Sequence, residues 1–176
     1  MKFEFNQISL SKGVNPIVYC LEGVNPNFLM DDAQVKELFS SKEFTGKIGE
    51  AASIGFGEQK LILAGLGKEK ELSFEKLVKA FGNAVKASKS RKTASVFLPK
   101  LGLSEQIVGE ALAQGTLIAT YSFQKYKTDS KPLALEKIIV CSNSSSLKKG
   151  VEQGAQIAEL INYCRDLDNE PGNVAT

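Results

Sequence analysis

The chain has 176 residues, enough for one domain with a buried core, or for one domain and a connector. Its 43% hydrophobic and 24% charged residues are ordinary globular values, and a net charge of +2 gives no general reason to expect nucleic acid or an anionic membrane as a partner. No apolar run approaches the roughly 20 residues of a membrane span, and the alternating start MKFEFNQISL gives no reason to expect an export signal.

The absence of histidine and the positions of the cysteines limit the catalytic and metal-binding chemistry that this segment could perform. The sequence has no histidine, which removes the usual general base and the commonest transition-metal ligand. Cys20, Cys141 and Cys164 lie far apart within apolar patterns, so we expect reduced, buried thiols of a cytoplasmic protein. A reactive or metal-binding cysteine is the less favoured alternative. We therefore expect no catalytic and no metal-binding residue in this segment.

The first part of the chain alternates short apolar runs with turn residues. Alternation over residues 2–10 and the apolar run 17–21 predict two strands. Asp31 is placed to cap a helix. The runs 47–56 and 59–66 flank a glycine-containing turn and predict a β-hairpin.

The second part alternates strands and helices. Ser73 begins a helix, which the strand 94–98 follows. Ser104 begins a longer helix that we expect to reach about Tyr126, before a strand at 137–141. The last element is a helix over about 146–167.

This alternation predicts the fold class. Strands and helices that follow one another with short linkers and right-handed crossovers form a largely parallel sheet with helices on both faces. The early strands and the hairpin make the sheet mixed, so we expect a three-layer α/β fold. The final helix should pack an apolar stripe on the sheet while its last turn and residues 169–176 stay loose. The stripe consists of Val151, Ala155, Ala158, Ile161 and Cys164.

The last dozen residues carry the densest turn chemistry. Pro171 biases Glu170 away from the helical region, so the helix should end near Asn169 and the chain should turn toward a further segment. The stretch resembles the junction between the N-terminal and catalytic domains of the leucyl aminopeptidase (cytosol aminopeptidase) family of two-metal peptidases. Six residues follow that family's Arg-acidic-Leu-x-Asn-x-Pro-x-Asn pattern, namely Arg165, Asp166, Leu167, Asn169, Pro171 and Asn173.

The resemblance extends upstream, because Gly46-Lys47, residues 61–68 and residues 121–128 match the family in the same order. Asp168 departs from it, since the family usually has an apolar residue there. The resemblance implies a macro-domain-like body over residues 1–145. Residues 146–176 would be the last helix of that domain and a connector toward a missing catalytic domain.

The resemblance also implies a function. Members of that family remove N-terminal amino acids from peptides and assemble as homohexamers. Their two divalent metal ions, zinc or manganese, lie in the catalytic domain. This segment would then be inactive by itself, in the cytoplasm, and would support oligomer assembly and access to the active sites. The alternatives are a stand-alone macro-like nucleotide-binding module and a DNA-binding domain.

One basic cluster could bind nucleic acid. Lys86, Lys89, Arg91 and Lys92, with Lys100 nearby, follow one another where a helix ends and a strand begins. Cations are also favoured at a helix C-terminus by the helix dipole, and few aromatic residues interleave with the cluster. We therefore expect a solvated helix end, with weak DNA binding at most.

Other motifs favour structural roles. Gly65-Leu66-Gly67-Lys68 fits neither the Walker loop nor the dinucleotide fingerprint, so it is interpreted as a turn that ends a strand. The aromatic residues Tyr121, Phe123 and Tyr126 are interpreted as packing residues. The carboxylate groups at 31–32 and 166–170 are not spaced as metal sites.

Overall fold

The chain folds around one six-stranded sheet with the order β1-β6-β5-β2-β4-β3. The structure, a computed structural model, describes residues 1–7, 14–24, 26, 29, 32–56, 59–88, 92–126 and 135–171. The strands are β1 (Lys2–Phe5), β2 (Pro16–Leu21), β3 (Ala51–Phe56), β4 (Gln59–Gly67), β5 (Thr93–Phe97) and β6 (Lys137–Val140).

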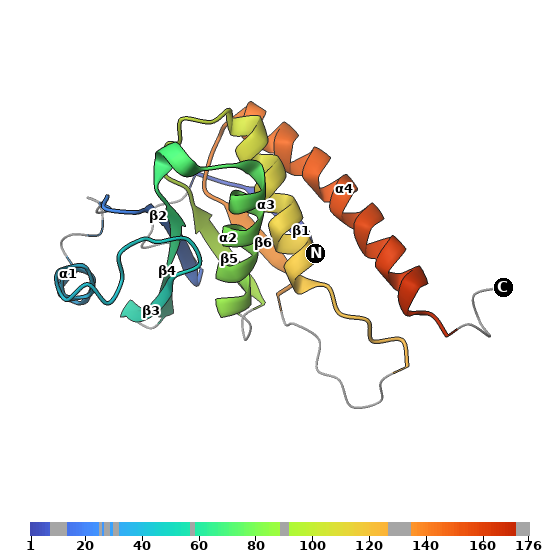
Figure 1. Ribbon diagram of the computed structural model, residues 1–176, viewed down its shortest axis with the longest axis horizontal. Coiled ribbons are helices and arrows are strands. Elements are labelled where there is room, and N and C mark those ends of the chain that lie inside the picture. The colour runs from blue at the N-terminus through green and yellow to red at the C-terminus, as the bar shows by residue number, and fades with distance from the viewer. Residues whose placement is uncertain are drawn as a thin grey trace.

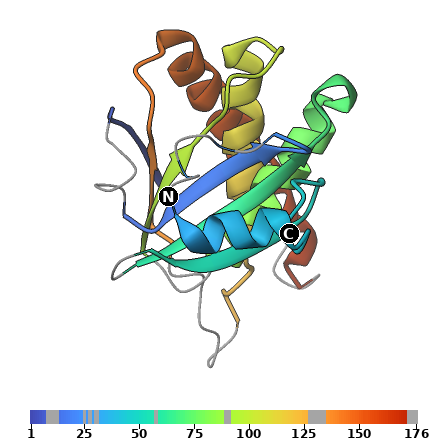
Figure 2. The same ribbon diagram turned by 90° about the vertical axis from the view of Figure 1, so that its left-hand side faces the viewer.

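Five of the six strands run parallel. In the centre of the sheet, Ile17 of β2 lies opposite Ile62 of β4 on one side and Val96 of β5 on the other. Among the strands that the structure describes, only the edge strand β3 is antiparallel, to β4, as the hairpin predicted (Figure 2). The prediction of a mixed, mostly parallel sheet is therefore confirmed.

Helices cover both faces of the sheet, so the predicted three layers are also confirmed. The helices are α1 (Ala33–Ser40), α2 (Phe74–Ala87), α3 (Glu105–Thr120) and α4 (Ser145–Asn169), with a short 3-10 helix η3 (Glu69–Glu71) before α2. Figure 1 shows α1 on one side of the sheet, α2 and α3 on the other, and α4 beyond α3.

The central strand β2 is buried on both faces because it contributes to two cores. Ile17 and Tyr19 face α2 and α3, where Tyr19 packs edge-on against Phe81 with 4.8 Å between ring centroids. Val18 and Cys20 face the other way, toward α1. A strand covered on both faces reads as a continuous apolar run, which is why β2 was visible in the sequence.

The helix starts follow local capping. The side chains of Ser73, Ser104 and Ser144 each accept a hydrogen bond from a backbone N–H in the first turn of α2, α3 and α4. Helix α1 is capped by Asp32, whose carboxylate accepts from two backbone N–H groups. The prediction of Asp31 as the cap was thus one residue early, and Asp31 itself lies outside the described residues.

Some predicted ends differ from the structure. Helix α3 ends at Thr120, not near Tyr126, because Tyr121 is extended and the following residues run along the end of α4. Strand β3 begins at Ala51, since residues 47–50 form a loop. The first strand is seen over Lys2–Phe5, and residues 8–10 of the predicted strand lie outside the described part of the chain.

Helix α4 packs mainly against α3 through glycines. A Cβ atom on Gly150 would lie 2.0 Å from the carbonyl oxygen of Gln106, and one on Gly154 would lie 2.3 Å from that of Glu110. Backbones this close leave no room for larger side chains. The predicted stripe was therefore wrong in part: Val151 and Ala158 are buried, but Ile161 and Cys164 are exposed.

Candidate functional site

A cavity lies at the carboxyl ends of β5 and β6, between the first turns of α3 and α4. Its volume is about 580 Å³. Ligands of open α/β sheets bind at this edge of the sheet, so this cavity is a candidate binding site. The walls are mostly apolar, with polar groups at a few positions. The lining includes Val96, Leu98, Leu103, Val108, Val140, Leu147, Lys100, Ser104, Glu105, Cys141 and Ser142.

Several polar groups of this cavity have structural roles. The Ser104 hydroxyl caps α3, and the Ser144 hydroxyl beside the cavity caps α4 and donates to the carboxylate of Glu105. Burial raises the pKa of the Cys141 thiol to about 11, which keeps the nucleophilic thiolate scarce at neutral pH. The lining therefore suits an apolar group and holds no nucleophile paired with a base.

The Gly65–Lys68 motif lies beside a smaller cavity of about 250 Å³. Gly67 has a positive φ of 80°, and a Cβ atom on Gly65 would lie 2.0 Å from the carbonyl oxygen of Lys47. The glycines thus allow the loop at Lys47 to cross the end of β4. Lys68 pairs with Glu71 at 3.5 Å. The motif was interpreted as a turn that ends a strand, but Gly65, Leu66 and Gly67 are the last three residues of β4 itself, and only Lys68 lies beyond the strand.

The loop at residues 45–50 is organised by a carboxylate that the sequence analysis did not single out. Glu50 accepts hydrogen bonds from the backbone N–H of Thr45 at 2.9 Å, from the Thr45 hydroxyl at 3.0 Å and from the backbone N–H of Lys47 at 3.1 Å. Partial burial acts to raise the pKa of Glu50, but these bonds outweigh it and lower the pKa overall. The only sequence signal was Gly46-Lys47, noted as a family match.

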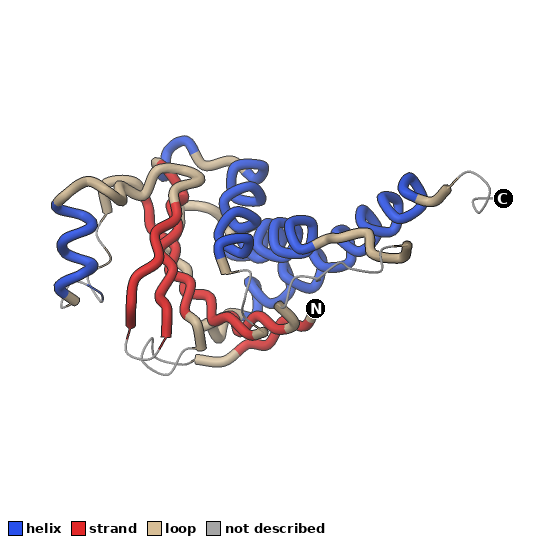
Figure 3. The backbone as a smooth tube through the Cα atoms, turned by 90° about the horizontal axis from the view of Figure 1, so that it is seen from below, coloured by secondary structure: helices blue, strands red, loops and turns tan. Residues whose placement is uncertain are grey.

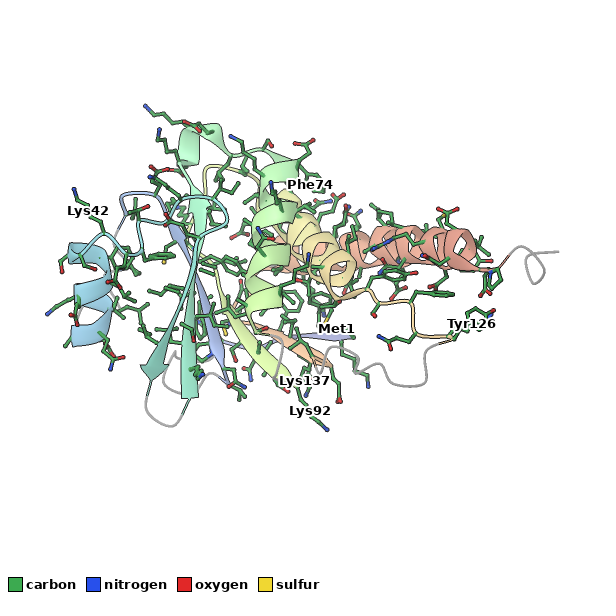
Figure 4. All side chains as sticks on the ribbon, turned by 60° about the horizontal axis from the view of Figure 1, so that its bottom comes forward. Met1, Lys42, Phe74, Lys92, Tyr126 and Lys137 are labelled. Carbon is green, nitrogen blue, oxygen red and sulfur yellow. The ribbon has the colours of Figure 1, made fainter. Side chains whose placement is uncertain are left out.

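The predicted basic cluster is seen only in part. Lys86 and Lys92 are exposed, whereas Lys89 and Arg91 lie outside the described residues. Lys92 lies 3.8 Å from Glu136, and the neighbouring Lys137 pairs with Glu4 at 2.9 Å (Figure 4). Acidic side chains thus interleave with the lysines here, and weak DNA binding at most stays a prediction.

The predicted aromatic residues meet the end of α4. The Tyr121 hydroxyl donates to the carboxylate of Asp166 at 2.8 Å, and the Arg165 guanidinium lies 3.9 Å from the centre of the Tyr121 ring. Arg165 also donates to the carbonyl oxygen of Ile118 on α3. Tyr121 is therefore a packing residue with a bonded polar tip, as predicted.

A second set of contacts holds the last turn of α4. Lys125 and Tyr126 both donate to the carboxylate of Glu170, Lys125 at 2.6 Å. The bonds from Lys125 and then Tyr126 lower the pKa of Glu170, and the bond to Glu170 raises the pKa of Lys125. The last turn is thus held and not loose as predicted. We call this contact the clasp, made by Tyr121, Lys125, Tyr126, Arg165, Asp166 and Glu170.

Three of the carboxylates considered as metal ligands have other partners, and Asp31 lies outside the described residues. Asp32 caps α1, while Asp166 and Glu170 belong to the clasp. Over the described ranges, no three His, Cys, Asp or Glu side chains are grouped so that they could hold a metal ion. None of the helices described is both long and apolar enough to cross a lipid bilayer.

The three cysteines are free. Cys20 is buried, and burial raises the pKa of its thiol to about 12. Cys141 is partly buried and Cys164 is exposed. The prediction of a buried thiol was thus correct for Cys20 and wrong for Cys164, whose side of α4 faces away from α3.

Comparison with known proteins finds relatives of this sequence and structures that share its fold. Residues 30–130 match the description "Cytosol aminopeptidase family, N-terminal domain". A probable cytosol aminopeptidase of Koribacter versatilis is 32% identical over 80% of this chain and 32% of its own length. One of Alkaliphilus oremlandii is 29% identical over 100% of this chain and 39% of its own length.

Solved structures with a similar fold include an aminopeptidase. A mutant of tomato leucine aminopeptidase superposes with a TM-score of 0.84 at 18% identity, over 100% of this chain and 39% of that protein. At this identity the likeness shows the fold alone. The chain spans about a third of the length of the curated relatives that it matches.

Proposed function

The chain belongs to the cytosol aminopeptidase family as its N-terminal domain, and from this premise we propose that it is the non-catalytic part of an aminopeptidase that removes N-terminal amino acids from peptides. The proposal rests on the part of the relatives that this chain covers. This chain matches the description of the family's N-terminal domain, and the relatives are about three times longer than this chain. In this proposal residues 1–145 are the domain body and residues 146–176 are its last helix and a connector.

The described side chains do not fit a two-metal centre. The whole sequence lacks histidine, and the carboxylates of Asp166 and Glu170 are engaged by Tyr121 and Lys125. We therefore assign the two divalent ions of the proposed enzyme, zinc or manganese, to the catalytic domain that makes up the rest of the relatives' length.

The proposal includes a homohexamer in the cytoplasm, in which this domain supports assembly and shapes access for peptide substrates. No specific observation favours the two alternative functions, a nucleotide-binding module and a DNA-binding domain. The mostly apolar lining of the cavity does not favour a nucleotide, and acidic partners beside Lys92 and Lys137 do not favour DNA.

The test compares two proteins: the 176-residue chain, and the protein encoded by its natural reading frame through any continuation. Each is purified and incubated with leucine p-nitroanilide and either Mn²⁺ or Zn²⁺. We expect metal-dependent hydrolysis by the longer protein and none by the 176-residue chain. Metal-dependent hydrolysis by the short chain, with contaminating peptidases excluded, overturns the proposal. So does a reading frame that encodes no metal-binding domain.

A further inference from the structure

An apolar surface runs along the C-terminal half of α4. Five of the eleven large hydrophobic side chains exposed in the described part of the chain lie between Ile157 and Leu167 of this helix, among them Leu160 with 66% and Leu167 with 51% of its surface exposed. Cys164 is exposed beside them. We call this surface the α4 stripe, which consists of Ile157, Leu160, Ile161, Tyr163, Cys164 and Leu167.

The α4 stripe lies on one side of the helix, because its positions recur at three- and four-residue intervals. The other side of α4 contacts α3: Ala158 is fully buried, Asn162 donates to the carbonyl oxygen of Leu117, and Arg165 donates to that of Ile118. No described segment covers the stripe. Figures 1 and 3 show this half of α4 extending beyond the sheet.

The stripe is held in place before any partner binds. Bonds from Tyr121 to Asp166 and from Lys125 to Glu170 fix the last two turns of α4 against the segment that follows α3. A contiguous apolar patch kept in a fixed position in water marks an interaction surface, because its burial by a partner is favourable and requires little further ordering.

We propose that the α4 stripe is the docking surface for the domain that follows α4 in the longer relatives. This inference rests on the proposed function and deepens it by naming the surface that the catalytic domain contacts. Similarity to the relative from Alkaliphilus oremlandii extends over 100% of this chain but 39% of that protein. Since this chain matches the family's N-terminal domain, the remaining residues of such a relative continue from the end of α4, beside Leu167.

The tether and the size of the stripe favour this occupant over a second copy of the chain. A domain joined by a short connector is present at an effective concentration of order millimolar, whereas a second copy must bind from dilute solution. The stripe is about 15 Å long and one helix wide. A stable dimer commonly buries about 800 Å² on each partner, more than one such strip offers.

Cys164 reports whether the stripe is covered. The rate at which a maleimide labels Cys164 is measured by peptide mapping in the 176-residue chain and in the longer protein. We expect Cys164 to react at least tenfold more slowly in the longer protein. Cys20 serves as the internal reference, because its buried thiol should react slowly in both proteins.

Two variants make the test specific. Leu160→Asp in the longer protein should restore fast labelling of Cys164, while leaving the melting temperature of the 176-residue chain unchanged, since Leu160 is exposed there. Glu152→Lys is the matched control, as Glu152 is an exposed α4 residue outside the stripe. It should leave Cys164 protected.

Each outcome decides one question. Equal labelling of Cys164 in the two proteins overturns the inference, even where the longer protein hydrolyses peptides as proposed. Protection of Cys164 in a longer protein that hydrolyses no peptide supports the docking surface and removes the proposed activity. If light scattering shows that the 176-residue chain is a dimer that Leu160→Asp dissociates, the occupant is a second copy and the inference is wrong.

Discussion

The hydroxyl of Tyr121 donates a hydrogen bond to the carboxylate of Asp166, although the two residues are 45 positions apart in the chain. Arg165, the neighbour of Asp166, lies over the Tyr121 ring. Arg165 and Asp166, which match the family's domain junction, therefore have a structural role in this domain. They fasten the end of α4 to the segment that leaves α3.

Removal of the Tyr121 hydroxyl should weaken this attachment. We expect Tyr121→Phe to lower the free energy of unfolding more than a substitution at an exposed tyrosine does, because a charge-assisted hydrogen bond is removed while the ring still packs under Arg165. Urea denaturation of the 176-residue chain measures the change. Tyr163→Phe is the control, since Tyr163 is exposed and should change stability by less than about 0.5 kcal/mol. Equal effects of the two substitutions would contradict the importance of this bond.

The crossing of α3 and α4 should not tolerate a methyl group. Gly150→Ala places a Cβ atom 2.0 Å from the carbonyl oxygen of Gln106, so the helices must separate. We expect a loss of at least about 1–3 kcal/mol of stability. Gly55→Ala is the control, because its nearest neighbour, an oxygen of Gln34, lies 3.8 Å away. Thermal denaturation compares the two, and an unchanged melting temperature for Gly150→Ala would show that the crossing is looser than described.

The two halves of α4 should differ in how much they contribute to the free energy of unfolding. Leu147 is buried in the core under α3, and Leu147→Ala should cost about 2–5 kcal/mol. Leu167→Ala removes a half-exposed side chain and should change stability by less than about 0.5 kcal/mol in the 176-residue chain. Chemical denaturation of both variants tests this, and the reverse order would mean that the α4 stripe is buried.

The Glu50 loop should confer a stability that depends on pH. The pKa of Glu50 is lower in the folded chain, so its contribution is present above the unfolded value of about 4.3 and is lost as pH falls through the folded pKa. We expect Glu50→Gln to lower stability by about 1 kcal/mol at pH 7, with a difference from the wild type that shrinks below about pH 4. Urea titrations at several pH values measure it. Glu43→Gln, at an exposed position near the loop, is the control and should change stability by less than about 0.5 kcal/mol at pH 7.

Any DNA binding should be weak and independent of sequence. If Lys86 and Lys92 neutralise phosphates, changing both to Ala should reduce the slope of log affinity against log salt by about 0.9 for each phosphate that is no longer neutralised. Lys42→Ala is the control, because Lys42 lies on the α1 side, far from Lys92 in Figure 4. Fluorescence anisotropy with two unrelated duplexes gives both slopes. Tight binding of only one duplex at physiological salt would contradict this prediction.

The elements that were predictable from sequence are those that local interactions define. The caps Ser73 and Ser104 act within one turn, and β2 shows its burial as a continuous apolar run. The end of α3 was missed because Tyr121 is held out of the helix by Asp166, which no local pattern reveals.

The orientation of α4 was missed for a different reason. The helix has two candidate faces, one of large apolar residues such as Ile161 and one of small residues such as Gly150 and Gly154, and the larger residues appeared to be the packed face. Close backbone approach reversed the choice. The Glu50 loop was missed because its bonds join one carboxylate to nearby backbone groups, without any hydrophobic period.

The glycine contacts of α4 also make the helix a lever. Its closest approach to α3 is at Gly150 and Gly154, while the axis continues for about 16 Å from Ala158 to Asn169. A tilt of about 5° at Gly154, about 22 Å from Asn169, would move that end of the helix by about 2 Å. The contacts of Gly150 and Gly154 with carbonyl oxygens of α3 thus determine the direction in which the chain leaves the C-terminal end of α4. A mutation that only widens the crossing would therefore act at a distance, by misdirecting whatever the helix points to.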